Sequence, residues 1–174
     1  MKPKVSVYLA LSIDGYIATP DGGVSWLDPF HDPEDDFGWG DFFGSIDCLL
    51  MGRNTWDVVQ QFPWPYGDKQ VYVRTRRELP AKNGEQAVAG TIPDILEQLA
   101  ERGHKHVYLD GGVTAQDAFE AGVVDEVTLT TVPVVLGDGI PLFRRGWGPH
   151  RWTLVSARGS RIGMVQSIYR PRHD

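Results

Sequence analysis

The feature that most constrains the fold is a change in the order of elements along the chain. From residue 5 to about 121, short β-branched or apolar runs alternate with helical patterns, as in α/β domains. Three apolar runs at 126–135, 152–157 and 164–169 then follow without intervening helices. The pattern predicts a mostly parallel central sheet with helices on both faces, completed by antiparallel C-terminal strands. The length of 174 residues predicts a single domain over 1–174.

Individual elements are expected where apolar runs meet turn and capping residues. The first strand is expected at 5–11, and further strands at 47–51, 69–75 and 106–109. Helices are expected at 34–45, from residue 52 onward, at 91–100 and from 113 to about 121. Thr91 is placed to cap the third of these helices, with Asp94 near its positive end. Gly38 and Gly40 weaken the helical pattern at 34–45.

Charge and cysteine content exclude several classes of protein. The net charge of −6 argues against nucleic acid as the main partner. Cys48 is the only cysteine, so neither an internal disulfide nor a thiolate metal site can form, and the five histidines show no metal-ligand spacing. The sequence shows no signal-peptide pattern and no apolar run long enough to span a membrane. We therefore expect a cytoplasmic protein without metal or membrane partners.

Two predicted strand-to-helix junctions carry residues suited to binding phosphate. They are Leu50-Met51-Gly52-Arg53-Asn54-Thr55-Trp56 and Tyr108-Leu109-Asp110-Gly111-Gly112-Val113-Thr114. Helix N-termini beyond the carboxyl ends of parallel strands present free amides, and glycine lets a phosphate approach the backbone closely. Two such junctions suggest a ligand with several phosphates. Taken alone, glycines at strand ends more often only form turns.

The whole string at the first junction supports a family resemblance. Residues 51–56 resemble the Met-Gly-Arg-x-Thr-Trp signature of dihydrofolate reductases, and 9–18 resemble that family's first strand and turn. The stretch from 124 to 139 resembles instead the reductase domain of the bifunctional riboflavin-biosynthesis deaminase/reductase. Because these two families share a fold, both resemblances imply a dihydrofolate reductase-like domain that uses NADPH.

The resemblance also implies which residues hold the cofactor. Arg53 and Thr55 would meet its phosphates, with Arg53 near the 2′-phosphate of the adenosine. The end of the strand at 69–75, with Arg74, Thr75 and Arg76, would also lie at this 2′-phosphate. The remaining implied cofactor residues are Gly52, Gly111, Gly112, Val113 and Thr114 at the junctions, with Ala10 and Ile17 beside the nicotinamide. For Ala10 and Ile17, ordinary core packing is an equal alternative.

The residues that would act on the substrate are fewer. Counted without gaps, the family's substrate-binding acid falls on Asp36 and its helper threonine on Thr130. We expect Asp36 to be shielded from water, with a raised pKa, because such an acid positions and protonates a ring nitrogen. Other acids crowd residues 32–41, so a solvated helix face is the alternative.

Two departures from the resemblance bear on the substrate. The arginine that anchors the folate tail has no counterpart near Tyr66, and the loop at 19–33 is longer and more acidic than usual. Folate itself is therefore not implied. The sequence predicts an NADPH-dependent reductase that transfers a hydride to a small pterin-like or aminopyrimidine-like heterocycle. The alternative is a non-catalytic NADP-binding module. The resemblance and the apolar late strands also predict a homodimer.

Overall fold

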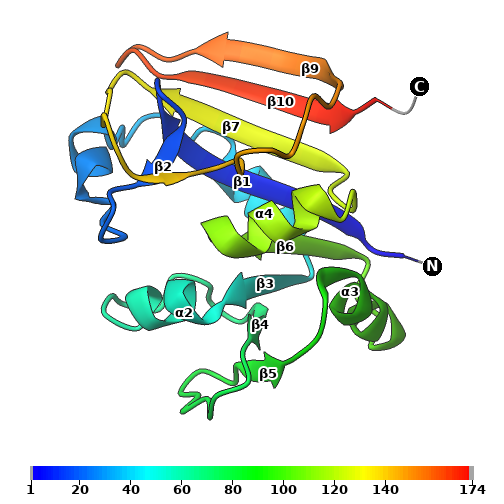
Figure 1. Ribbon diagram of the computed structural model, residues 1–174. Coiled ribbons are helices and arrows are strands. Elements are labelled where there is room, and N and C mark those ends of the chain that lie inside the picture. Colours follow the sequence, from blue (N-terminus) through cyan, green and yellow to red (C-terminus); the bar gives the residue numbers. More distant parts are fainter. Residues whose placement is uncertain (1, 173–174) are drawn as a thin grey trace. The chain divides into compact units, whose positions relative to one another are not determined.

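The chain forms two compact units that share its first strand. The structure is a computed structural model that describes residues 2–172 (Figure 1). The first unit contains the chain up to Ser6 together with Ser45–Val124, and the second contains Val7–Gly44 and the chain from Asp125 onward. Strand β1 (Lys4–Ser12) therefore contributes its first three residues to the first unit and the rest to the second.

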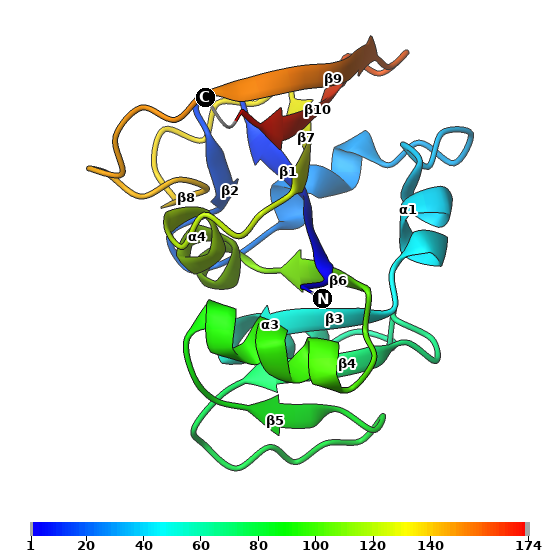
Figure 2. The same cartoon turned by 90° about the vertical axis from the view of Figure 1, so that its right-hand side faces the viewer.

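The first unit is built on parallel strands. Its strands are β3 (Cys48–Gly52), β4 (Gln70–Arg74), β5 (Gln86–Val88) and β6 (His106–Asp110). Their hydrogen-bonded order is β5-β4-β3-β6, and all three pairings are parallel (Figure 2). Residues Cys48–Met51 are fully buried, because a parallel strand that is covered on both faces needs a continuous apolar run. The predicted parallel sheet is confirmed.

Three helices belong to the first unit. They are α2 (Arg53–Val59), α3 (Ile92–Glu101) and α4 (Gly112–Glu120). The start of α3 is fixed by a capping box, in which Thr91 Oγ1 accepts from the Asp94 amide and the Asp94 carboxylate accepts from the Thr91 amide. The predicted cap at Thr91 is thus confirmed. Helix α3 buries the apolar face of Ile92, Ile95, Leu96 and Leu99.

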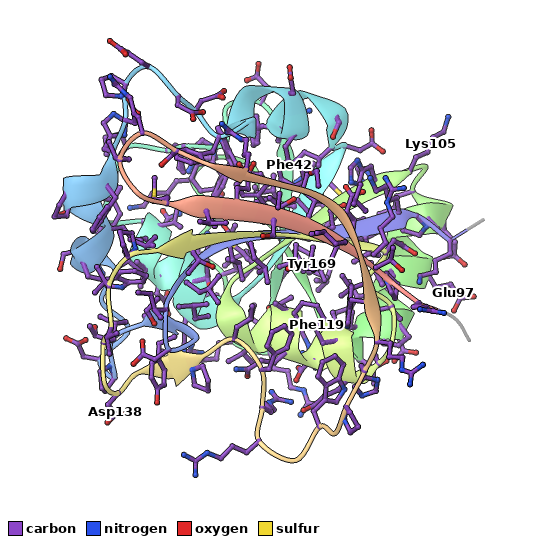
Figure 3. The ribbon with its side chains drawn as sticks, turned by 90° about the horizontal axis from the view of Figure 1, so that it is seen from above. Phe42, Glu97, Lys105, Phe119, Asp138 and Tyr169 are labelled. Atoms are coloured by element: carbon purple, nitrogen blue, oxygen red, sulfur yellow. The ribbon has the colours of Figure 1, made fainter. Side chains whose placement is uncertain are left out.

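The second unit is antiparallel at its C-terminal end. It holds β7 (Glu126–Val132), β9 (Trp152–Gly159) and β10 (Val165–Pro171) in the order β1-β7-β10-β9, as Figure 3 shows from above. Strand β10 pairs antiparallel with both β7 and β9, which confirms the predicted antiparallel C-terminal strands. A separate pair joins β2 (Tyr16–Ala18) to β8 (Ile140–Pro141).

The helix expected at 34–45 is shorter than predicted. Helix α1 covers only Trp39–Ser45, and a 3-10 helix, η1 (Ser25–Phe30), precedes it. Phe37 and Gly38 both have positive φ, at 57° and 77°, which a right-handed helix does not allow. The prediction for residues 34–38 is wrong because this left-handed pair forces the helix to begin after it.

Candidate functional site

The two phosphate-binding junctions predicted from the sequence lie next to each other in the first unit. Strands β3 and β6 are hydrogen-bonded parallel neighbours, with Met51 opposite Asp110. Helix α2 follows β3 directly, and α4 follows β6 after Gly111 alone. Both helices therefore begin at the same edge of the sheet (Figure 1).

Each junction packs its glycine against the threonine of the other. A Cβ added to Gly52 would lie 3.2 Å from Thr114 Oγ1, and a Cβ added to Gly111 would overlap Thr55 Oγ1. Gly111 also has a φ of 91°, a conformation that favours glycine. These contacts require glycine at position 111 and leave little room for a side chain at position 52, and they draw the first turns of α2 and α4 together. The structure thus brings together Gly52, Thr55, Gly111, Gly112, Val113 and Thr114.

The first turns of both helices lack a side-chain cap. The N-cap residues are Gly52 and Gly111, neither of which has a side chain to accept from the helix amides. Val113 is exposed, whereas Thr114 is buried. The uncapped amides at the positive end of α4, with the glycine backbone of the neighbouring junction beside them, favour an anionic ligand such as a diphosphate.

Arg53 is already engaged by its neighbours. Its Nε donates to Asp57 Oδ1 at 2.8 Å and its guanidinium to the Glu78 carbonyl at 2.7 Å. Its Cζ lies 4.9 Å from the centroid of the Trp56 ring, within the range of a cation–π contact. The carboxylate of Asp57 offsets the charge of Arg53, so this arginine is a weaker anion binder than the sequence suggested.

The arginines at the end of β4 differ from one another. The Arg74 guanidinium forms an ion pair with Asp117 on α4, and its Nε donates to the Gly90 carbonyl at 3.0 Å. Thr75 Oγ1 accepts from the Arg77 amide at 3.0 Å, which forms a tight turn around Arg76. Arg76 is exposed, and among the described residues it has no ionic partner. Of the three arginines predicted at the 2′-phosphate, Arg53, Arg74 and Arg76, only Arg76 has a guanidinium without a partner among the described residues.

Asp110 is an acid that the sequence reasoning missed as a site residue. It ends β6, directly before Gly111, and its Oδ2 accepts from the Tyr66 hydroxyl at 2.6 Å. Burial raises the pKa of this carboxyl, although the Tyr66 hydrogen bond opposes the shift. A carboxyl with a raised pKa beside a ligand-binding backbone is a candidate proton donor. The sequence did contain a sign of this role, because the acid stands at the end of a predicted strand, directly before Gly111 and Gly112.

The predicted acid Asp36, in the second unit, has an environment unlike the expected one. Its side chain is exposed, and its carboxylate accepts from the amides of Gly38 at 2.8 Å and Gly40 at 3.0 Å. These two hydrogen bonds, Gly40 first, lower the pKa of Asp36. The expectation of a shielded Asp36 with a raised pKa is wrong, because the carboxylate satisfies free amides at the start of α1. The catalytic role of Asp36 stays a prediction.

Thr130 belongs to a buried polar network in the second unit. Gln166 Nε2 lies 3.3 Å from Thr130 Oγ1, 2.9 Å from the Tyr8 hydroxyl and 2.8 Å from the Phe37 carbonyl. The Tyr8 hydroxyl also donates to the Phe37 carbonyl at 2.6 Å. Thr130 is thus connected through Gln166 to the residue that follows Asp36, and the network fixes the left-handed backbone there.

The residues predicted to border the nicotinamide also lie in the second unit. Ala10 is on β1 and Ile17 on β2, and both are half-buried. The turn between these strands is held by Asp14, whose carboxylate accepts from the Leu136 amide at 3.1 Å and the Gly137 amide at 2.7 Å. Whether Ala10 and Ile17 contact a cofactor stays a prediction.

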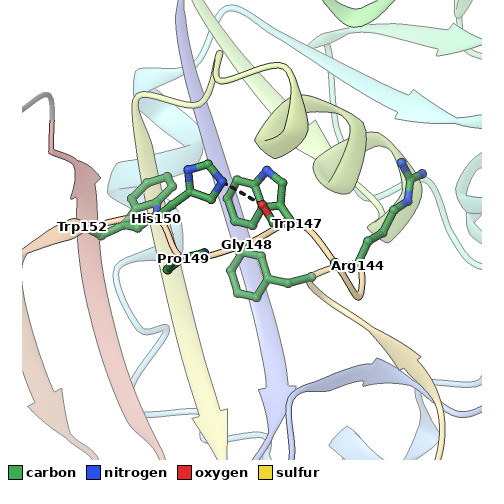
Figure 4. A pocket seen from close by; sticks show the side chains of 8 residues that line it. Arg144, Trp147, Gly148, Pro149, His150 and Trp152 are labelled. Atoms are coloured by element: carbon green, nitrogen blue, oxygen red, sulfur yellow. Dashed lines mark hydrogen bonds between the residues drawn. The ribbon is translucent and has the colours of Figure 1, made fainter.

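An aromatic hollow lies in the loop after β8. It has a volume of about 520 Å³ and is lined by residues between Phe143 and Trp152 (Figure 4). The Trp147 ring stacks on His150 with centroids 4.0 Å apart and on Phe143 at 5.7 Å. The rings fill much of this loop themselves, so the hollow is a secondary candidate for ligand binding.

Neither a metal cluster nor a membrane span is found in the part of the chain that the structure describes. Over residues 2–172, no three His, Cys, Asp or Glu side chains are grouped to hold a metal ion. Within the same residues, every helix is too short or too polar to cross a membrane.

Comparison with known proteins assigns the family. Residues 3–165 match the profile of the RibD C-terminal domain. The chain belongs to the RibD C-terminal domain family. The resemblance to riboflavin-pathway reductase domains predicted from residues 124–139 is therefore confirmed. The uncharacterized protein YwjB of Bacillus subtilis is 36% identical over 150 residues, covering 82% of this chain and 84% of that protein.

Solved structures confirm the fold. A putative riboflavin biosynthesis protein from Shewanella sp. PV-4 is 32% identical, with a TM-score of 0.89 over 99% of this chain and 100% of that one. A dihydrofolate reductase from Enterococcus faecalis, complexed with NADP(H), has a TM-score of 0.70 at 18% identity, over 98% of this chain and 97% of that one. The RibD C-terminal domain family member described here thus has the predicted dihydrofolate reductase-like α/β fold.

Proposed function

We propose that this protein is an NADPH-dependent reductase that transfers a hydride to a C=N bond of a pterin-like or aminopyrimidine-like ring. The observation that carries the proposal is the pair of junctions in the first unit, where Gly52 packs on Thr114 and Gly111 on Thr55. These contacts bring the glycine backbones of both junctions together at one sheet edge, beside the uncapped N-terminus of α4, which suits the diphosphate of a dinucleotide. Membership of a family named for a riboflavin-pathway protein supports the choice of ring.

Different residues of the chain would bind the cofactor and transfer the proton. The amides at Gly111–Thr114 and Arg53–Thr55 would hold the diphosphate, and Arg76 would bind the 2′-phosphate. When bound, NADPH supplies the hydride. Asp110 is half-buried, and the loss of water around its carboxyl lets it keep a proton to a higher pH than an ordinary aspartate, so it is suited to donate to a ring nitrogen. Asp36 and Thr130 remain the candidates of the second unit.

A direct test is to measure cofactor binding and oxidation separately. NADPH binding is followed by fluorescence, and oxidation by loss of NADPH absorbance in the presence of dihydropterins or aminopyrimidines. Binding with turnover on any such ring supports the reductase. Binding without oxidation across the whole set would favour the non-catalytic NADP-binding module, and no binding would contradict both functions.

Arg76 is expected to set the preference for NADPH over NADH. A charge-assisted contact to the 2′-phosphate contributes roughly 1.5–3 kcal/mol, or about tenfold or more in affinity. Arg76→Ala should therefore weaken NADPH binding about tenfold and leave NADH binding nearly unchanged. The matched control is Arg145→Ala, an exposed arginine of the other unit. Equal affinity of the wild type for the two dinucleotides would contradict the assignment.

We also propose that the protein is a homodimer that pairs through strand β9. Strands β7 and β10 are hydrogen-bonded on both sides, and β9 is the edge strand of the second unit. Leu154 and Val155 on β9 are 53% and 46% exposed, which is unusual for apolar residues on an unprotected edge. Ultracentrifugation should show twice the chain mass of 19.4 kDa. A single monomeric species at micromolar concentration would exclude the dimer.

A further inference from the structure

Glu85 has a buried carboxylate and is not part of the proposed binding site. It precedes β5 and is only 5% exposed. Burial alone would raise the pKa of Glu85. The hydrogen bonds from the Asn83 amide and the other donors outweigh this effect and lower the pKa to about 2. Glu85 is therefore ionised at every pH at which the protein would be assayed. A buried charge is costly unless its hydrogen bonds are complete, so its partners are informative.

Every hydrogen bond to Glu85 comes from a neutral group on one of two elements. Oε1 accepts from Trp56 Nε1 at 3.0 Å and from Gln60 Nε2 at 3.1 Å, both on or directly after α2, and from Asn83 Nδ2 at 3.3 Å. Oε2 accepts from the amides of Lys82 at 3.0 Å and Asn83 at 2.7 Å. The carboxylate thus joins α2 to the end of the segment between β4 and β5, which we call loop 75–85.

The other end of loop 75–85 is joined to the same helix. The Glu78 carbonyl accepts from the guanidinium of Arg53, the first residue of α2. The Arg53 guanidinium in turn lies over the ring of Trp56, the residue that donates to Glu85. In addition, the Arg77 guanidinium forms an ion pair with Asp57 on α2, with 3.7 Å between its nitrogen and Asp57 Oδ2. Loop 75–85 is therefore attached to α2 at both ends.

The cation that we assign to the 2′-phosphate lies in the same loop, directly before the attachments at Arg77 and Glu78. Arg76 is exposed and follows Thr75 in a turn closed by the Arg77 amide. The position of Arg76 depends on how the loop is held, because its own side chain has no partner among the described residues. A loop free to move would lose part of the contact, since ordering it on binding costs entropy.

We propose that Glu85 is a positioning residue that holds loop 75–85 against α2 and so places Arg76 to distinguish NADPH from NADH. This inference rests on the proposed function. Glu85 itself touches no ligand in this assignment. Its carboxylate is suited to the role because it accepts at both oxygens, whereas a glutamine must turn its NH₂ toward one set of donors. Glu85→Gln therefore releases one side of the attachment without changing the size of the side chain.

The first test compares dissociation constants for NADPH and NADH. We expect Glu85→Gln to weaken NADPH binding about tenfold and NADH binding less than about twofold, because only NADPH carries the phosphate that Arg76 meets. Gln60→Ala removes a single donor and should act in the same direction with a smaller effect. Glu97→Gln makes the same chemical change on the exposed side of α3, where Figure 3 shows the side chain, and should leave both constants unchanged.

The second test needs no cofactor. Trypsin cleaves after Arg76, Arg77 and Lys82, all within loop 75–85. Under native conditions, Glu85→Gln should be cut in this loop at least about tenfold faster than the wild type or Glu97→Gln, because local opening controls cleavage.

The outcomes separate the inference from the function on which it rests. Equal weakening of both dinucleotides, or an unchanged ratio, would overturn the positioning role, as would unchanged cleavage of the loop. A wild type that binds neither dinucleotide would refute the proposed function and the positioning role together. Faster cleavage of Glu85→Gln in that case would identify Glu85 as a structural attachment only.

Discussion

Gly111→Ala is expected to destabilise the protein strongly and to abolish NADPH binding. At φ 91° and ψ 148°, Gly111 occupies a region almost confined to glycine, where another residue costs about 1–3 kcal/mol. The new Cβ would also overlap Thr55 Oγ1, and overpacking of this kind adds about 1–3 kcal/mol. The two costs together are about 2–6 kcal/mol and should lower the unfolding temperature by about 4–24 °C in a chain of this size. Thermal and urea unfolding followed by circular dichroism would measure the loss.

Two further variants test whether the overlap with Thr55 Oγ1 causes the loss of stability in Gly111→Ala. Gly44→Ala on α1 is the control, because a Cβ there meets no atom within 4 Å, and its stability should change by less than about 1 kcal/mol. Adding Thr55→Ala to Gly111→Ala removes the overlapping hydroxyl and should restore part of the stability, while the backbone strain remains. If Gly111→Ala unfolds at the wild-type temperature, the close packing of the two junctions is wrong.

Asp110→Asn is expected to lower kcat/KM by about 10²-fold while making the protein more stable at neutral pH. Burial raises the pKa of Asp110 in the folded state, so the folded protein holds this proton more tightly than the unfolded chain. The stability that this provides is complete below the ordinary aspartate pKa and is lost as pH rises through the raised value. Asparagine does not ionise, so the variant escapes that loss, and its advantage should grow as pH rises above about 4.

The pH dependence of turnover distinguishes a proton donor from a structural acid. Wild-type activity should fall as pH rises through the pKa of Asp110, because the protonated carboxyl is the active form. Tyr66→Phe removes the hydrogen bond that opposes the shift, so the fall should move to higher pH. Asp68→Asn, an exposed acid of the same unit, is the control. If Asp36→Asn abolishes turnover and Asp110→Asn does not, the proton donor is Asp36.

The strands and helices that depend on local sequence were predictable. Residues 48–51 form the continuous apolar run that a buried parallel strand requires. Thr91 and Asp94 have the spacing of a capping box, which predicts the start of a helix. Strands β2, β5 and β8 were missed because each has only two or three residues and gains its order from pairing rather than from its own sequence. The start of α1 was misplaced because a phenylalanine at positive φ has no local signal.

The sequence predicted which backbone segments form the binding site, but not which of its charged side chains are already paired. The glycines and threonines of the two junctions are where the sequence placed them, since strand-end glycine has a local conformational cause. The pairing of Arg74 with Asp117 spans 43 residues, and no local pattern reveals which arginine stays unpaired. Asp36 was misjudged for a related reason, because its exposure depends on the turn that precedes α1.

Cys48, fully buried in β3, gives the protein an experimental advantage. Burial raises the pKa of its thiol to about 12, so only about one molecule in 10⁴ carries the reactive thiolate at pH 8. A cysteine introduced at the exposed position of Arg76 would have an ordinary pKa near 8.5 and react roughly a thousand times faster. A fluorescent maleimide would then label loop 75–85 selectively in the otherwise native chain, and its emission would report the movement of that loop directly.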